Sequence, residues 1–363
     1  MGRVSTVPDV EASPGTTLPE GFELRKLARR AIQVALLIGV FVLIVLLAPG
    51  LGEVRGYLRA ADPWWVAVAI AFELLSCISY VLMFRPVFCK RMSWAMSSKI
   101  GWSELGVGAI VPASGAAGLA LGAWALTQAG MSLQYVARRS VAFFTIKSSV
   151  NFVAVAVLGT LMAIGLIGPP ISLWLTALPA AMSVATIALV LALPKLGDGG
   201  PVPEDASRLR RWFGHARGSV IHGVREASEI VRQRNALVIV GALGYWAWDN
   251  AVLWATFQAF GADVDITIIL MGYLIGQLGG LLPIPGGVGG IDGGLIGTLI
   301  VFGAPAAVTV AAVLVYRVIL FWLPLVGGAI GFVGLTRALK RGDVVCAPPD
   351  MDDLPVVYLP MRP

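Results

Sequence analysis

The sequence predicts an all-α polytopic membrane protein with about six full spans and two broken re-entrant helical hairpins in an inverted repeat. The first observation is composition: of 363 residues, 57% are hydrophobic and 13% are charged, which is too apolar for a soluble domain. The second is that several apolar runs reach the roughly 20 residues that cross a bilayer. The third is that two apolar segments are interrupted by proline and glycine, which break helices.

The two ends of the chain are predicted to be tails. Residues 1–24 are polar and are expected to form a disordered cytoplasmic tail, and 342–363 are expected to form a flexible C-terminal tail. The apolar run 31–48 has a basic flank like a signal peptide. The long polar tail before it and the lack of an A-x-A-like cleavage site favour a retained first span. Residues 25–341 are therefore predicted to be one transmembrane domain.

Six segments satisfy the length rule for ordinary membrane spans. They are 31–48, 64–84, 140–168, 172–194, 236–259 and 306–336. Two further apolar segments, 100–130 and 266–303, contain the prolines and glycines. Each is expected to dip into the membrane as a broken hairpin and return.

The distribution of Lys and Arg supports this arrangement. If each broken segment crossed the membrane once, the basic N-terminus and the basic loop 195–235 would lie on opposite sides. If each returns, all basic clusters lie on one side, as the positive-inside rule prefers. The termini and loop 195–235 are therefore predicted to be cytoplasmic. The net charge of +6 is then a topology signal, and we expect no nucleic-acid partner.

The two broken segments share a motif. Pro112–Gly118 reads P-A-S-G-A-A-G, Pro283–Gly289 reads P-I-P-G-G-V-G, and both fit P-x-x-G-x-x-G. Two halves, 64–168 and 236–336, would carry one motif each in opposite orientations. That pattern is typical of inverted-repeat transporters, whose site lies at the repeat interface. Chance matching of small residues in a Gly- and Ala-rich chain is the alternative.

Charged residues flank both motifs in the same order. Glu73 lies 39 residues before Pro112, and Asp249 lies 34 before Pro283. Lys147 follows Pro112 by 35 residues, and Arg317 follows Pro283 by 34. The matched order of acid, broken hairpin and base favours a repeat over coincidence.

The loop between the halves, 195–235, contains an amphipathic pattern with apolar residues at helical spacing and several arginines. Such a helix either lies in the headgroup plane or packs on the bundle. The three cysteines show no metal or disulfide spacing and are expected to be inert.

Broken backbone at membrane depth is tolerated where it is buried or lines a wet cavity. A half-helix starting near Gly289 would direct unpaired N–H groups and a positive dipole end into that cavity, which suits a phosphate or carboxylate. Five ionisable residues are predicted deep in the membrane and should face the bundle and be paired. These are Glu73, Lys147, Asp249, Asp292 and Arg317. Four others near predicted span ends are expected to snorkel. These are Arg85, Glu104, Arg138 and Arg139.

The run GYLIGQLGGLLPIPGGVGGIDGGLIGTL, followed by AVLVYR and WLP, resembles the membrane region of the lysylphosphatidylglycerol synthase/flippase family. The resemblance covers about 25–341. It implies a flippase for aminoacylated phosphatidylglycerol, whose synthesis belongs to a separate soluble domain. No such domain follows Arg341, so we do not expect enzymatic lipid aminoacylation. The glutamate usual after the family's motif is replaced by Asp292, which points to lipid or lipid-linked cargo rather than lysyl lipid in particular.

The sequence therefore predicts a non-enzymatic flippase or transporter of the cell membrane, without cofactor or metal, that binds an anionic headgroup at the two hairpins. The predicted substrate-binding residues are Glu73, Pro112, Gly115, Gly118, Lys147, Asp249, Pro283, Gly286, Gly287, Gly289, Asp292 and Arg317. Membrane lipid is the expected partner, and a homo-oligomer or an envelope-enzyme partner stays open. One alternative is an intramembrane aspartyl protease using Asp249 and Asp292. A non-transporting membrane scaffold is another.

Overall fold

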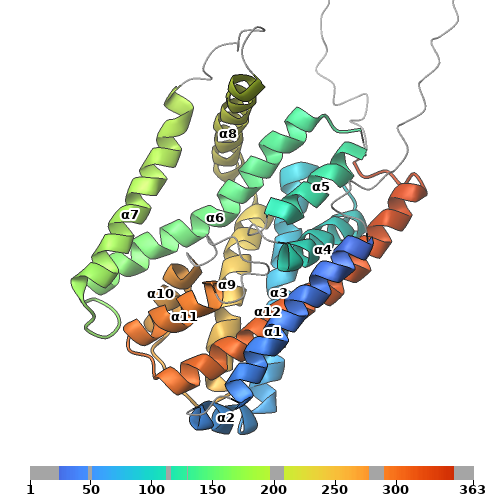
Figure 1. Ribbon diagram of the computed structural model, residues 1–363. Coiled ribbons are helices and arrows are strands. Elements are labelled where there is room, and N and C mark those ends of the chain that lie inside the picture. Colours follow the sequence, from blue (N-terminus) through green and yellow to red (C-terminus); the bar gives the residue numbers. More distant parts are fainter. Residues whose placement is uncertain are drawn as a thin grey trace, which may run out of the picture.

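The computed structural model describes most of the chain, and the described part is helical and without strands (Figure 1). The described ranges are 24–47, 51–111, 116–128, 130–196, 208–277 and 290–346. The two predicted tails lie outside these ranges apart from their innermost residues. The helices are α1 (Leu24–Leu47), α2 (Gly52–Arg59), α3 (Pro63–Phe88), α4 (Trp94–Ile110), α5 (Ala116–Gln128), α6 (Leu133–Ala163), α7 (Leu173–Ala192), η1 (Leu193–Leu196), α8 (Arg208–Arg232), α9 (Ala236–Gln258), α10 (Ile266–Gly276), α11 (Gly290–Val301) and α12 (Ala306–Lys340).

Five helices of the described ranges are long and apolar enough to cross a membrane: α3, α6, α7, α9 and α12. Each coincides with one of the predicted spans, and α1 overlaps the remaining one. The protein is thus an all-α polytopic membrane protein. Several helices extend beyond their predicted spans: α1 begins at Leu24 and α6 at Leu133, while α3 continues to Phe88 and α12 to Lys340. Hydropathy locates the apolar part of a helix, whereas polar turns can continue the same helix outside it.

Side-chain caps set where several helices begin. The side chain of Asp62 accepts from the backbone N–H of Trp64 at 2.9 Å at the start of α3. Ser93 caps α4 in the same way, through the N–H of Met96 at 3.1 Å. Such caps satisfy N–H groups that have no partner within the helix. They fix the corners where the chain enters α3 and α4.

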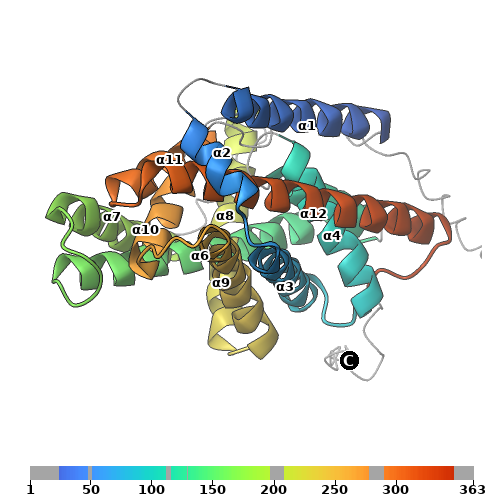
Figure 2. The ribbon, with the colours of Figure 1, turned by 90° about the horizontal axis from the view of Figure 1, so that it is seen from below.

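Helices α3 and α9 pack side by side, in the middle of the view of Figure 1 and along the lower edge of the bundle in Figure 2. Small residues permit the close approach: a Cβ added at Gly241 of α9 would lie 2.8 Å from the carbonyl oxygen of Ser79 on α3. Helix α12 packs on α4 in the same manner, since a Cβ at Gly106 would lie 2.7 Å from the Cα of Gly328. Contacts of this kind are typical of helices in membranes.

Two pairs of shorter helices lie on either side of α3 and α9 in Figure 1. Helices α4 and α5 contact each other at the upper right of Figure 1, and α10 and α11 contact each other at the lower left. The start of α1 and the end of α12 lie toward the same, upper right side. Helices α3 and α9 are therefore flanked by one helix pair from each half of the sequence.

The helix predicted within loop 195–235 is α8. It packs on α6, and Ile221, Val224 and Ala227 are buried at 2–4% exposure. A Cβ at Gly223 would lie 3.0 Å from the carbonyl oxygen of Arg138 on α6. Of the two alternatives for this segment, the structure has the helix packed on the bundle.

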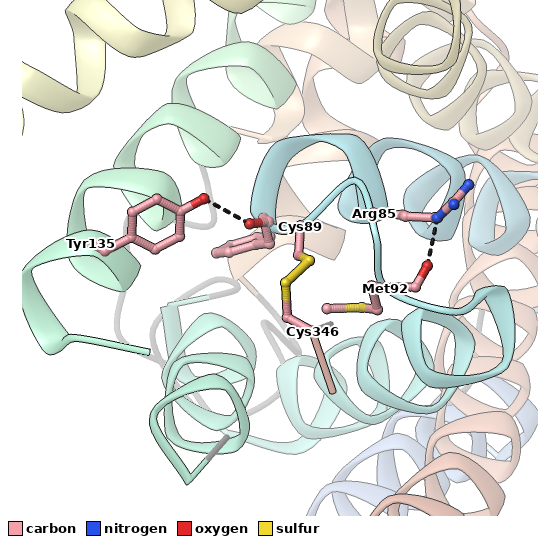
Figure 3. The surroundings of a disulfide bond; sticks show 6 residues. Arg85, Cys89, Met92, Tyr135 and Cys346 are labelled. Atoms are coloured by element: carbon pink, nitrogen blue, oxygen red, sulfur yellow. Dashed lines mark hydrogen bonds between the residues drawn. A yellow bond between two sulfur atoms is a disulfide. The ribbon is translucent and has the colours of Figure 1, made fainter. Parts of the chain in front are cut away.

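A disulfide joins Cys89, directly after α3, to Cys346, beyond α12, with the two Cα atoms 6.1 Å apart (Figure 3). The expectation of three inert cysteines is therefore wrong. Nearby, the Tyr135 hydroxyl donates to the carbonyl oxygen of Phe88 at 2.9 Å. The ends of α3, α6 and α12 are thus tied together. Because 257 residues separate the two cysteines, no local spacing could reveal the pair.

Candidate functional site

Half of the predicted site residues lie within the described ranges. These are Glu73, Gly118, Lys147, Asp249, Asp292 and Arg317. The remaining residues belong to the two glycine- and proline-rich motifs and lie outside the described ranges. These are Pro112, Gly115, Pro283, Gly286, Gly287 and Gly289.

The second half of the chain contains a buried ion pair. Nε of Arg317, on α12, lies 2.5 Å from Oδ1 of Asp292, on α11, and the side chains are 11% and 1% exposed. Asp292 stands in the first turn of α11, where the helix dipole favours a negative charge. Helix α11 thus brings Asp292 into the interior, against α12.

Asp249, on α9, is held instead by two tyrosines. Its Oδ1 accepts a hydrogen bond from the Tyr316 hydroxyl on α12 at 2.9 Å, and its Oδ2 accepts one from the Tyr273 hydroxyl on α10. Both tyrosines are buried, at 1% and 5% exposure. Arg317 also acts on Asp249 electrostatically. The carboxylate thereby links α9 to both neighbouring helices of its half.

Glu73, on α3, is only 5% exposed and lies near Asp249. The Cys77 thiol, one turn further along α3, donates to its Oε1 at 3.5 Å. The two acids thus lie close together across the contact between α3 and α9. Because an apolar interior disfavours two neighbouring negative charges, this pair is suited to holding a proton or a substrate cation.

The first half contains a buried acid that the sequence interpretation placed wrongly. Glu104, on α4, was expected to snorkel at a span end, yet it is 2% exposed. Its Oε2 accepts from the Tyr80 hydroxyl at 2.7 Å, whereas Oε1 is buried without a hydrogen-bond partner in the described ranges. Helix α5 covers it closely: a Cβ at Gly122 would overlap this carboxyl group, and one at Gly118 would lie 3.3 Å from the Cα of Glu104.

Lys147, on α6, directs its ammonium group among aromatic rings. Nζ lies 5.5, 5.7 and 5.8 Å from the ring centroids of Tyr245, Phe144 and Tyr80. Rings at such distances attract a cation. Glu104 acts on Lys147 electrostatically, but Lys147 forms no ion pair within the described part of the chain. Its positive charge is therefore available to an anionic group.

Tyr245 connects the two clusters. Its ring lies 5.6 Å from that of Tyr80 and faces Lys147, while its hydroxyl lies in the electrostatic field of Asp249 and Glu73. A helical turn separates Tyr245 from Asp249 on α9, so both face the same way. The charged groups of the two halves therefore form one continuous set of buried and half-buried side chains around the α3–α9 contact.

The arrangement differs from an aspartyl protease site, in which two aspartates share one proton. Asp292 is paired with Arg317, and Asp249 is held by two tyrosine hydroxyls. Among the described residues there is also no group of three or more His, Cys, Asp or Glu side chains that could hold a metal ion. The ionisable side chains inside the helical bundle are therefore suited to binding charged groups.

Fold and site together define a multi-pass membrane protein with ionisable side chains clustered in its interior. Residues 32–328 match the family of the lysylphosphatidylglycerol synthase TM region, and the chain belongs to this family, as the motif resemblance implied. A UPF0104 membrane protein of Methanothermobacter thermautotrophicus is 26% identical over 315 residues, covering 80% of this chain and 91% of its own. A second UPF0104 membrane protein of that organism is 25% identical over 338 residues, covering 84% and 93%.

Proposed function

We propose that this protein moves a lipid or lipid-linked substrate across the cell membrane by binding its anionic headgroup inside the bundle. The observation that carries the proposal is the continuous set of buried and half-buried polar groups, from Lys147 through Tyr245 and Asp249 to Arg317. Ionisable side chains at membrane depth are costly and usually mark substrate or proton pathways. Membership of a lipid-related membrane family supports the same function.

The proposed architecture is an inverted repeat with two re-entrant hairpins. Helices α3 and α9 correspond to each other, as do the pairs α4–α5 and α10–α11, and as do α6 and α12. In support, each half has an acid on its hairpin, Glu104 or Asp292, and a base on the following long helix, Lys147 or Arg317. In such transporters the site lies at the repeat interface, which here is the contact of α3 with α9.

We assign roles to the side chains by charge. Lys147 and Arg317 would hold the phosphate of the headgroup, assisted by backbone N–H groups of the two motifs. Glu73, Asp249 and Asp292 would hold an amine or relay protons. The sequence contains no nucleotide-binding loop, so transport would follow a gradient, depend on a partner, or be equilibrative.

We also propose that the termini and loop 195–235 face the cytoplasm. In support, the start of α1, the end of α12 and helix α8, which all carry basic residues, lie toward the upper part of Figure 1. Basic residues near span ends favour the cytoplasmic side.

The test is lipid translocation in reconstituted vesicles that contain a tail-labelled fluorescent phospholipid, with an impermeant quencher added outside. Vesicles with the protein should expose labelled lipid from the inner leaflet. Lys147→Gln should slow translocation about tenfold or more, because a charged hydrogen bond to phosphate is worth about 1.5–3 kcal/mol. Lys195→Gln, which removes an exposed lysine of η1, is the matched control and should be unaffected.

Three results would refute the proposal. One is a wild-type protein that folds in vesicles and translocates no phospholipid. Another is Lys147→Gln at the wild-type rate. The third is cleavage of a membrane peptide by the same sample, which would favour the protease alternative.

A further inference from the structure

A large apolar groove outside the charged site is lined mainly by residues of α6, α7 and α8, which are labelled in Figure 1. Its volume is about 880 Å³, within the range of pockets that bury a small ligand. Side chains such as Phe144, Phe152, Ile187, Val190 and Val224 line it. The α6 and α7 sides of the groove belong to helices that are long and apolar enough to cross a membrane.

The length of the groove matches one leaflet. On α6 the lining runs from Ser140 to Phe152, which at 1.5 Å per residue is about 18 Å. Half of a hydrocarbon core of about 30 Å is about 15 Å. The lining residues of α7, Thr186 to Leu191, belong to its last turns, next to η1, which also contacts α8. The α6 side of the groove is therefore about as long as one leaflet is thick.

Polar and basic groups mark the end of the groove at α8. Ser140 Oγ lines the groove and is buried without a hydrogen-bond partner in the described ranges. Arg232, in the last turn of α8, also lines it, is exposed, and forms no ion pair with a described residue. A chain that lay in the groove could thus carry a negatively charged group at this end. The apolar length and the basic end are complementary to a phospholipid with its acyl chain inserted.

The groove adjoins the charged site through one side chain. Phe144 lines the groove, is 45% exposed, and its ring centroid lies 5.7 Å from Nζ of Lys147. Helix α6 thus carries the groove on one face and the buried lysine on the next. A headgroup that moved around Phe144 would pass from the basic end of the groove toward Lys147.

We infer that the groove between α6, α7 and α8 binds an acyl chain of an anionic phospholipid from the leaflet on the α8 side. This inference deepens the proposed function, on which it rests for the statement that the bound lipid is a substrate. Binding in the groove and movement across the membrane are measured separately, so each can fail without the other.

The test uses phosphatidylglycerol with a photoactivatable group in one acyl chain, diluted into phosphatidylcholine vesicles that contain the whole protein. After illumination, adducts are mapped by mass spectrometry of peptides. We expect adducts to concentrate on the groove-facing residues of α6, α7 and α8. Ser149→Trp fills the groove from α6 and should reduce these adducts about tenfold, which corresponds to a loss of about 1.4 kcal/mol of binding. Val153→Trp, at an exposed position of α6 that does not line the groove, should leave them unchanged.

A second groove variant, Ser228→Phe on α8, tests the same site if Ser149→Trp does not fold. Arg232→Gln should reduce the preference for the phosphatidylglycerol probe over a phosphatidylcholine probe. Equal adducts on the outer faces of α1 and α12, or unchanged adducts in both groove variants, would overturn the inference. So would cross-links from groove residues to a second copy of the chain. If groove adducts form in a protein that moves no lipid, the proposed function fails and the binding site stands.

Discussion

The ion pair of Asp292 and Arg317 is expected to stabilise the folded protein, and variants of the two residues test this. The perturbations are Asp292→Asn, Arg317→Gln and the double variant, each of which keeps side-chain size nearly constant. The pair is buried, with 2.5 Å between Nε and Oδ1. Breaking a buried pair by removing one partner costs about 3–5 kcal/mol. The two single variants should not cost the same, because Arg317 also acts on Asp249.

The magnitudes follow from the charges that remain. Asp292→Asn leaves Arg317 beside Asp249, so a compensating negative charge survives and the loss should be about 3 kcal/mol. Arg317→Gln leaves Asp292 and Asp249 without the arginine, so the loss should be about 5 kcal/mol. At about 2–4 °C per kcal/mol, Asp292→Asn should lower Tm by about 6–12 °C and Arg317→Gln by about 10–20 °C. The double variant should lose less than the sum of the two singles.

The assay is thermal unfolding of the purified variants in one detergent, with lipid translocation measured on the same samples in vesicles. Arg337→Gln, an exposed arginine near the end of α12, is the matched control and should leave Tm unchanged. The reasoning would be refuted if the stability losses of the two single variants simply added up in the double variant, or if Asp292→Asn lost more stability than Arg317→Gln. A double variant that recovers stability yet moves no lipid would support a role in substrate handling. A double variant with full translocation activity would show that the pair is purely structural.

Three further predictions concern other parts of the molecule. Gly122→Val should destabilise the folded protein far more than Gly297→Val. An added Cβ overlaps the Glu104 carboxyl in the first case and meets nothing within 4 Å in the second. Equal Tm values for the two variants would contradict this packing. In intact cells, an impermeant thiol reagent should label Asp263→Cys and miss Gln233→Cys, and the reverse result would invert the proposed orientation. Gly289→Val should abolish translocation at near-normal expression, because a branched side chain does not fit where a break in the helix or a close approach requires glycine. A normal translocation rate would show that this position needs no glycine.

The spans could be predicted from the sequence because a helix that crosses the hydrocarbon of a bilayer needs about 20 apolar residues in a row. Five predicted spans accordingly coincide with helices in the structure. The inward position of Asp249, Asp292 and Arg317 could be predicted for the same reason, since charges within such runs must face the protein. Burial of a charge can therefore be deduced from its position in an apolar segment.

The partners of these charges could not be predicted, because they depend on tertiary geometry. Tyr273 and Tyr316 hold Asp249 from two other helices, and the only local signal was that Tyr316 precedes Arg317 in the sequence. Glu104 was misplaced because it stands near the start of an interrupted segment, where distance from a span end is ambiguous. Its burial follows from the cover that α5 provides, which hydropathy does not describe.

Helix α12 has a mechanical consequence for the two charged clusters. It is a single helix of 35 residues, about 52 Å long. Gly328 on this helix lies close to Gly106, which stands two residues beyond Glu104 on α4. Arg317 lies 11 residues earlier, about 16 Å away, and Pro324 stands between the two. A proline inside a helix removes a backbone hydrogen bond and allows a kink at that point. A displacement of α4 that keeps the glycine contact closed therefore carries the end of α12 with it, and bending at Pro324 allows Arg317 and its partner Asp292 to stay in place.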